Sequence, residues 1–237
     1  MARPRRFTDD QVLDAARDLL ADPATSRPTI AAISAASGIH TGSIYVRFAS
    51  REELLARLWL RSIQRFQIGI VAALEGADPL LTAAMHLPRY CREHPTEARA
   101  MKMFRREELL DVGSAELRTE IAGVNDRMND ALRAAVVAEF GDADEHRMAI
   151  AVAAVKAIPY GLVREYIANA APIPDWVDEV IATATAAVVH RLGRTDIYWG
   201  GTGVGRRPPS TAGRSDTRAS SHTPRTRGLP NPPSTRT

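Results

Sequence analysis

The sequence predicts an all-helical fold in two parts: a three-helix helix-turn-helix unit at the N-terminus and a larger helical domain after it. Three observations favour this fold. Up to residue 193 the chain is rich in Ala, Leu, Glu and Arg and has few of the alternating β-branched residues that are typical of strands. Pro and Gly gather at intervals where helices would end. Three short helical segments precede one long segment, which is the order that a helix-turn-helix unit requires.

Local capping signals define the three short helices. The first begins at a capping box, Thr8-Asp9-Asp10-Gln11, and we expect it to end near Asp22. The second has Thr29 as its N-cap and stops at Gly38, because glycine readily adopts the left-handed backbone found at helix ends. The third is very short and begins near Thr41. Three helices are therefore expected within the first fifty residues.

A second capping box, Ser50-Arg51-Glu52-Glu53, begins a long helix with one apolar stripe. At 1.5 Å per residue this helix reaches about 35 Å, so it can connect two domains rigidly. Further breaks are expected at residues 76–79, 94–95, 111–114, 141–142 and 171–174. They delimit five more helices. One of these runs through residues 117–136 without interruption, and the last covers residues 175–192.

The composition changes near Thr195 to Arg, Pro, Ser, Thr and Gly, which bury too little apolar surface to fold, so we expect a disordered tail. The predicted domains are residues 1–50, 51–193 and 194–237. The tail holds eight Arg and two Asp, a charge of +6, whereas the chain as a whole carries +3 and the remainder about −3. The net charge of the chain is therefore no evidence for nucleic-acid binding, which must be argued from the residues of a particular motif. The role of the basic tail stays open.

Cysteine content and hydropathy suggest a cytoplasmic protein. A single cysteine, Cys91, excludes an internal disulfide and fits a reducing compartment. Thr8 and Asp9 follow the basic start of the chain, where a signal peptide would need apolar residues. The longest apolar runs, at residues 68–74 and 149–155, are far shorter than the roughly 20 residues that cross a bilayer. We expect no membrane span.

The segment 29–54 places two short helices around a tight turn, which is the geometry of a helix-turn-helix. In such a unit the second helix enters the major groove of DNA, so its N-terminal end needs small or polar residues. Apolar residues of the segment can face inward, which directs Tyr45 and Arg47 outward toward phosphate oxygens. Arg51 adds a cation at the start of the next helix, beside free backbone N–H groups. The candidate DNA-binding residues are Thr29, Thr41, Gly42, Ser43, Tyr45, Arg47 and Arg51.

These residues resemble the tetracycline-repressor (TetR) family. Members typically have a first helix like residues 12–20 and then a Gly-Ile-x-x-Gly-Ser-Ile-Tyr-x-x-Phe-x-Ser-Arg-Glu-Glu-Leu run, which stands here at residues 38–54. The likeness covers residues 8–55. Ser34 and Ser37 stand where the family usually has Ala, and Arg47 stands where His, Asn or Tyr is more usual. These departures concern the DNA sequence that is bound rather than the fold.

The resemblance implies a DNA-binding transcriptional regulator, most often a repressor, that acts as a homodimer on an inverted-repeat operator of double-stranded DNA. The last two helices would form the dimer as a four-helix bundle, and the recognition helices would lie roughly 34–36 Å apart. A small, largely apolar effector would displace the long helix that begins at Ser50 and release the DNA. Residues beside apolar stripes that offer flexible, aromatic or hydrogen-bonding groups are candidates for the effector cavity: Met85, Tyr90, Met101, Phe104, Asn125, Met128, Asn129 and Tyr160.

Two alternatives stay open for the regulatory domain. His86, Cys91 and His94 carry metal-ligand side chains, which would make the protein a metal-responsive regulator, although their spacing matches no established metal site. The protein could also bind DNA without any effector. We assign no catalytic residue and no cofactor, because the lone cysteine has no orienting acid or glycine-rich oxyanion turn beside it in the sequence.

Overall fold

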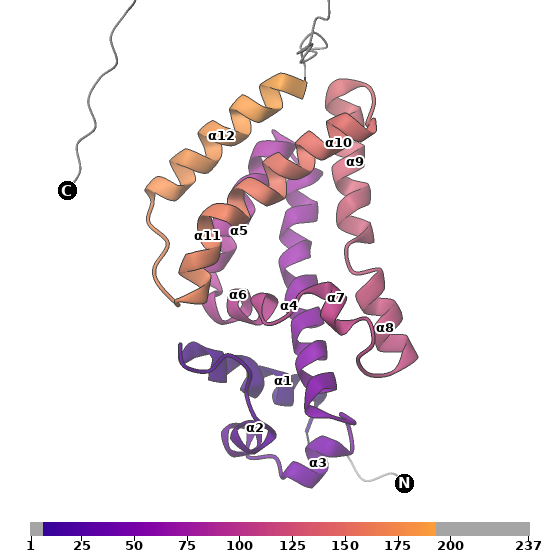
Figure 1. Cartoon of the computed structure of the whole chain (residues 1–237), viewed down its shortest axis with the longest axis vertical. Coiled ribbons are helices and arrows are strands. Elements are labelled where there is room, and N and C mark those ends of the chain that lie inside the picture. Colours follow the sequence, from indigo (N-terminus) through magenta and orange to yellow (C-terminus); the bar gives the residue numbers. More distant parts are fainter. Residues whose placement is uncertain (1–6, 193–237) are drawn as a thin grey trace, which may run out of the picture. The chain divides into compact units, whose positions relative to one another are not determined.

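A computed structural model describes residues 7–192, which form helices and connecting segments without any β-strand (Figure 1). The prediction of an all-helical fold is confirmed. The predicted tail, residues 194–237, lies outside the described residues. The elements are α1 (Asp9–Asp18), the 3₁₀ turn η1 (Leu19–Ala21), α2 (Ile30–Ser37), α3 (Thr41–Tyr45), α4 (Arg51–Leu74), α5 (Pro79–Glu93), α6 (Pro95–Lys102), α7 (Arg106–Leu109), α8 (Ala115–Ala122), α9 (Asp126–Phe140), α10 (Glu145–Val152), the π-helical turn η2 (Ala153–Ala157), α11 (Ile158–Ala168) and α12 (Trp176–Leu192).

The caps of the N-terminal helices form as the sequence predicts, with one addition. Thr8 Oγ1 accepts from the backbone N–H of Gln11 at 3.2 Å, and Gln11 Oε1 accepts from the backbone N–H of Thr8 at 2.8 Å. Thr29 caps α2, which ends at Gly38 with a φ of 67°. His40 caps α3 through Nδ1, which accepts from the backbone N–H of Gly42 at 3.2 Å. An imidazole therefore takes the place that a hydroxyl or carboxylate usually fills.

Two serines fasten the turn between α2 and α3. Ser34 Oγ donates to the carbonyl of Ile39 at 2.7 Å. Ser37 Oγ donates to the carbonyl of Ile33 at 2.7 Å and accepts from the backbone N–H of Ile39 at 3.2 Å. Both polar groups of the Ile39 backbone are thereby satisfied next to a buried side chain, as burial demands. These are the two positions where the family usually has Ala, so the expectation that these departures leave the fold untouched is wrong: both serines hold the turn.

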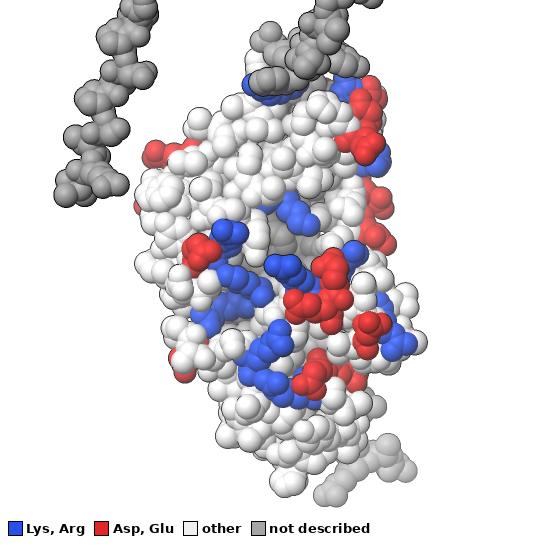
Figure 2. Space-filling model, in the orientation of Figure 1, with Lys and Arg blue, Asp and Glu red and all other residues white. Residues whose placement is uncertain are grey.

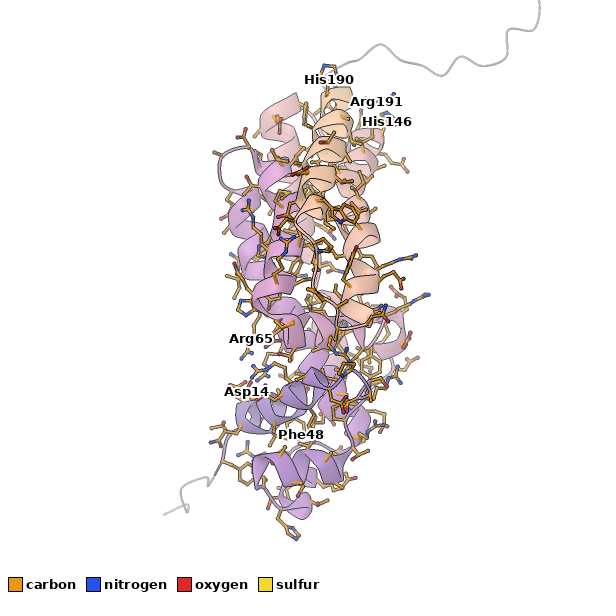
Figure 3. All side chains as sticks on the ribbon, turned by 90° about the vertical axis from the view of Figure 1, so that its left-hand side faces the viewer. Asp14, Phe48, Arg65, His146, His190 and Arg191 are labelled. Carbon is orange, nitrogen blue, oxygen red and sulfur yellow. The ribbon has the colours of Figure 1, made fainter. Side chains whose placement is uncertain are left out.

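The core of the N-terminal unit extends into the larger domain. Ile33, Ile44 and Phe48 are almost fully buried against apolar residues of α1 and of the first turns of α4 (Figure 3). Ala100 of α6 belongs to the same core, and Met103 packs at its edge. The N-terminal unit is thus completed by side chains from α4 and α6.

Helix α4 runs from the N-terminal unit along the larger domain, where it packs against α5, α6 and α9 (Figure 1). Its N-terminal part contributes Leu54, Leu55 and Leu58 to the core of the N-terminal unit, and its C-terminal part contributes Ile70 and Leu74 to a second core with α5, α9 and α10. Helix α5 lies between α4 on one side and α11 and α12 on the other. The two ends of this helix therefore belong to two separate cores, and its middle adds Trp59 and Leu60 to a third core with α8.

The expected uninterrupted helix over residues 117–136 is wrong, because the chain breaks between α8 and α9 at Gly123 to Asn125. Glycine inside a helix costs about 1 kcal/mol relative to alanine, and here the backbone turns so that the N–H of Asp126 donates to the carbonyl of Gly123 at 3.0 Å. Pro159 is accommodated differently. It lacks an N–H, and the π-helical turn of η2 directly before it widens the helix.

None of the helices among residues 7–192 combines the length and the apolar character that are needed to cross a membrane.

Candidate nucleic-acid interface

Helix α3 exposes a short polar surface next to the turn. Tyr45 is 49% exposed, while Ile44 is fully buried and anchors the helix on the core; the apolar Val46 directly after the helix is 86% exposed. Gly42 is exposed, and Thr41 and Ser43 are half-buried. Four of the predicted residues therefore lie together on one five-residue helix, preceded by the exposed His40, which the sequence interpretation did not include. The position of His40 directly before α3 is the sequence signal that could have identified it.

Arg47 does not point away from the protein, so that prediction is wrong. Its guanidinium forms an ion pair with the carboxylate of Asp9 and donates to the carbonyl of Phe7 at 2.9 Å. The guanidinium also lies 4.8 Å from the centre of the Phe7 ring, a cation–π contact. The side chain is only 17% exposed. Arg47 thus holds the start of α1 against the segment that follows α3, since an acidic first turn attracts it.

Arg51 is also engaged within the N-terminal unit. Its Nε donates to the carbonyl of Pro28 at 2.8 Å, and its Nη2 donates to the carbonyl of Arg27 at 2.6 Å. These carbonyls lie directly before Thr29, an exposed residue whose hydroxyl caps α2 by accepting from Ala32 N–H at 3.2 Å. Arg51 therefore fixes the place where α2 begins, which in turn positions the whole helix-turn-helix on α4.

A buried carboxylate ties the N-terminal unit to the larger domain. Glu97 of α6 is 5% exposed and accepts from Ser62 and, at 2.6 Å, from Arg65, both on α4. Arg17 of α1 reaches the same carboxylate at 3.3 Å. Asp14 of α1 accepts from Arg17 at 3.0 Å and lies 4.0 Å from Arg65 (Figure 3). We call Arg17, Ser62, Arg65 and Glu97 the α6 brace, because they join α1, α4 and α6.

The neighbours of Glu97 stabilise the ionised form of its carboxyl. Burial alone would raise the pKa of the Glu97 carboxyl, but the hydrogen bond from Ser62 and the contacts of Arg65 and Arg17 outweigh burial and hold the pKa below its ordinary value. The carboxylate is therefore ionised at neutral pH. The sequence interpretation missed this group, because its partners lie 32 to 80 residues away in the chain.

The eight residues proposed for the effector cavity do not surround one space. Met85 and Tyr90 are buried in α5, while Met101, Met128 and Phe104 are partly buried in different cores. Asn125 accepts from Gln67 Nε2 of α4 at 3.1 Å. Asn129 and Tyr160 are exposed, which contradicts their placement in a closed cavity. Helical spacing placed these residues beside the apolar stripes, but it did not indicate how the helices face one another.

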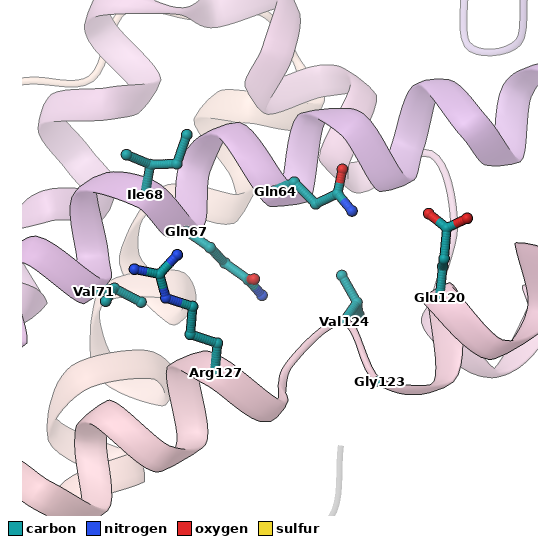
Figure 4. A pocket seen from close by; sticks show the side chains of 8 residues that line it. All are labelled: Gln64, Gln67, Ile68, Val71, Glu120, Gly123, Val124 and Arg127. Carbon is teal, nitrogen blue, oxygen red and sulfur yellow. The ribbon is translucent and has the colours of Figure 1, made fainter.

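A pocket of about 350 Å³ opens instead between α4 and the break that separates α8 from α9 (Figure 4). One wall consists of side chains from α4, and the opposite wall consists of α8, the break and the first turn of α9. Both polar and apolar side chains line it. The lining residues are Gln64, Gln67, Ile68, Val71, Glu120, Gly123, Val124 and Arg127.

The proposed metal ligands do not converge. Cys91 is buried in an apolar core with α11 and α12, and burial raises the pKa of its thiol to about 12, which disfavours the thiolate that binds metals. His86 Nε2 lies 3.0 Å from the carbonyl of Phe66, and burial lowers the pKa of its imidazole. His94 is exposed directly after α5, and its ring contacts that of Tyr90 with a tilt of 53° and 4.7 Å between the ring centres. Within residues 7–192, no three His, Cys, Asp or Glu side chains are grouped so that they can hold a metal ion.

A tight glycine turn, a short exposed second helix and a long supporting helix define the helix-turn-helix class of DNA-binding proteins. Residues 12–58 match the family model described as bacterial regulatory proteins, tetR family. The match covers the helix-turn-helix unit and the first turns of α4, and over these residues the chain is similar to the DNA-binding domain of such regulators.

Solved structures of the same fold span most of the chain. PfmR, a TetR family transcriptional regulator from Thermus thermophilus, is 22% identical with a TM-score of 0.54, covering 76% of this chain and 97% of its own. A transcriptional regulator from Rhodococcus sp. Rha1 is 14% identical with a TM-score of 0.59, covering 80% and 100%. FadR from Bacillus subtilis, solved in complex with stearoyl-CoA, is 16% identical with a TM-score of 0.55, covering 79% and 100%. No curated protein sequence matches the chain significantly.

The α6 brace predicts a pH-dependent stability. The folded-state pKa of Glu97 is lower than its ordinary value of 4.5. The ionised carboxylate therefore contributes its full stabilisation above pH 4.5, and this stabilisation is lost as the pH falls below that value. We expect Glu97→Gln to lower the free energy of unfolding at pH 7 by about 1–3 kcal/mol. The difference from the wild type should shrink as the pH falls below 4.5.

Denaturant unfolding at several pH values measures this difference. Glu120→Gln, a substitution of an exposed glutamate on α8, is the matched control and should leave stability nearly unchanged at every pH. A Glu97→Gln variant whose loss of stability is the same at pH 7 and at pH 4 would contradict the role of the charge.

Proposed function

We propose that the chain is a ligand-responsive repressor that binds an inverted-repeat operator as a homodimer and leaves it when a small effector binds between α4 and α9. The exposed polar surface of α3, beside an α2 whose start is fixed by Arg51 of α4, is the observation that carries the proposal. The match of residues 12–58 to the tetR family model supports the DNA-binding part. The dimer and the effector rest on the arguments that follow.

DNA contact is proposed through Thr41, Ser43 and Tyr45 of α3, with Gly42 allowing close approach of the backbone. Hydroxyl groups of this kind donate to phosphate oxygens and base edges. Thr29 and Arg51 are assigned supporting roles at the start of α2, because their polar groups already bind the protein. Arg47 reaches a phosphate only by leaving Asp9 and Phe7, so we assign it to the positioning of α1.

Dimerisation is proposed through α11 and α12, the last two helices. Large apolar side chains on these helices stay exposed: Tyr160 at 45%, Trp176 at 50% and Val180 at 41%. Exposed apolar side chains that gather on adjacent helices are typical of protein interfaces. Gly161, with no heavy atom near the position of a Cβ, leaves room for a second helix to approach α11. Two copies paired here would form the four-helix bundle that the family favours.

Effector binding is proposed in the pocket between α4 and the α8–α9 break. Its volume of about 350 Å³ is within the range of small-molecule sites. FadR from Bacillus subtilis carries stearoyl-CoA, but this pocket is too small for a whole acyl-CoA, so we propose a more compact effector with an apolar body and hydrogen-bonding groups. Because Gln64, Gln67 and Val71 belong to the helix that supports α3, a ligand that shifts α4 also shifts the recognition helix.

DNA binding is tested at Tyr45 with the protein's own upstream DNA. We expect Tyr45→Phe to weaken operator binding about tenfold, the loss of one hydrogen bond to a charged acceptor. The salt dependence should stay the same, since no charge is removed. Electrophoretic mobility or fluorescence anisotropy across a salt series measures both. Tyr166→Phe on α11 is the matched control and should bind like the wild type. An unchanged affinity in Tyr45→Ala, which removes the whole side chain, would contradict the proposed contact.

Dimerisation is tested by placing a charge on α12. Val180→Glu should convert the dimer to monomers at micromolar concentration, because an unpaired carboxylate at an apolar interface is costly. Sedimentation velocity measures the oligomeric state, and operator affinity should fall with it. Val137→Glu, at a similarly exposed valine on α9, should stay dimeric. If Val180→Glu remains dimeric as well, the interface lies elsewhere.

The effector pocket is tested by filling it. Gln67→Trp places a large side chain in the space between α4 and Val124, so it should abolish effector release while operator binding persists. The operator complex is titrated with a panel of metabolite-sized compounds to find one that dissociates the wild type. A compound that releases wild-type and Gln67→Trp protein equally well would place the effector site elsewhere.

A further inference from the structure

A second pocket, also of about 350 Å³, lies where the loop between η1 and α2 meets α6 and α11. Three of its lining residues are cations, two carry hydroxyls, and none is acidic. An apolar floor completes the lining. The residues are Leu20, Thr25, Ser26, Arg27, Arg99, Lys102, Met103, Ile167 and Ala168. Figure 2 shows Lys and Arg side chains gathered on the face where α6 lies next to α1 in Figure 1. We call this space the junction pocket.

Arg99 is the least compensated of these cations. Its Nη2 donates to three carbonyls of the loop, those of Asp22, Pro23 and Thr25, at 3.1 to 3.3 Å. Its Nε and Nη1 atoms are buried without a hydrogen-bond partner, and within residues 7–192 its guanidinium forms no ion pair. Buried guanidinium groups are normally paired with an anion, since unpaired N–H groups lose their hydration without replacement.

The other two cations are also weakly compensated. Lys102 Nζ donates to the carbonyl of Arg164 at 3.0 Å and has no carboxylate partner among the described residues. Arg27 lies over the ring of Phe104 at 4.3 Å and reaches Glu108 only at 3.6 Å, with both side chains half exposed. Three cations that face one pocket without acids in its wall produce a positive potential, which an anion would neutralise.

We propose that the junction pocket binds a phosphate group. A guanidinium, an ammonium and two hydroxyls supply the charge-assisted donors that a tetrahedral dianion accepts. The floor of Leu20, Met103 and Ile167 can hold a small organic body attached to the phosphate. This site is distinct from the pocket between α4 and α9, and the proposal does not depend on effector binding there.

A bound phosphate would bridge the loop before α2 to α6 and α11. Thr25, Ser26 and Arg27 belong to the N-terminal unit, whereas Arg99 and Lys102 belong to α6. Neutralising these charges removes their mutual repulsion and links the two sides of the junction through one ligand. The phosphate therefore stabilises the orientation of the helix-turn-helix that the α6 brace maintains.

Titration calorimetry of the full chain with sodium phosphate, at constant ionic strength in chloride, tests the site. The wild type should bind one phosphate per chain. Lys102→Gln should weaken binding by about tenfold, the loss of one charge-assisted donor. Lys156→Gln removes the only other lysine of the chain and should bind phosphate like the wild type. Lys102 is exposed, so its replacement is not expected to unfold the protein.

A further variant separates a built site from diffuse attraction. Ala168→Trp keeps every charge but fills the pocket, and it should lose phosphate binding. Adenosine monophosphate distinguishes the sources of the group: tighter binding than inorganic phosphate indicates an organic phosphate, and equal binding indicates the free ion, both in the same pocket. The proposal is overturned if the wild type binds no phosphate, if Lys156→Gln weakens binding as much as Lys102→Gln, or if Ala168→Trp binds like the wild type.

Discussion

The position of the DNA-binding unit depends on one buried carboxylate. A carboxylate that leaves water loses several kcal/mol unless charged and hydrogen-bonding partners replace its hydration. Glu97 obtains these partners only when Arg17 of α1 and Ser62 and Arg65 of α4 converge on α6. Any displacement of α6 that separates them exposes an incompletely paired charge. The α6 brace therefore defines a single favoured arrangement of α1, α4 and α6. Because the helix-turn-helix packs on α1 and α4, this arrangement also determines its position.

Helix α6 therefore connects the N-terminal unit to the larger domain as much as α4 does. Its eight residues carry the Glu97 carboxylate, the Arg99 guanidinium that binds three loop carbonyls, and Ala100, which is part of the N-terminal core. Helix α4 is stiff and spans both cores, so it transmits a displacement along its length. Helix α6 contacts the N-terminal unit and also packs against α5 and α11. If an effector acts as proposed, a change in the larger domain could reach α3 through α4 or through α6, and the sequence suggested only the route through α4.

The sequence predicted those features that depend on neighbouring residues. Capping boxes, the Thr29 cap and the Gly38 stop are local, and the helix boundaries in the first fifty residues follow from them. The break at Gly123 was missed because the apolar stripe continues across it. The surroundings of Arg47 and Glu97 were also missed, since their partners are 32 to 80 residues distant and helical periodicity does not indicate which helices meet. For the same reason the effector residues chosen from stripes did not form one cavity.

The internal engagement of Arg47 and Arg51 changes how this unit attracts DNA. An arginine that leaves Asp9 for a phosphate exchanges one anion for another, so the net gain in free energy is small. Arg51 would have to give up the two carbonyls that position α2. Within residues 7–192, α3 itself contains no cation. In the proposed complex, recognition by this surface would therefore rest on hydroxyls and on shape, with the two arginines holding α1 and α2 in the geometry that presents α3.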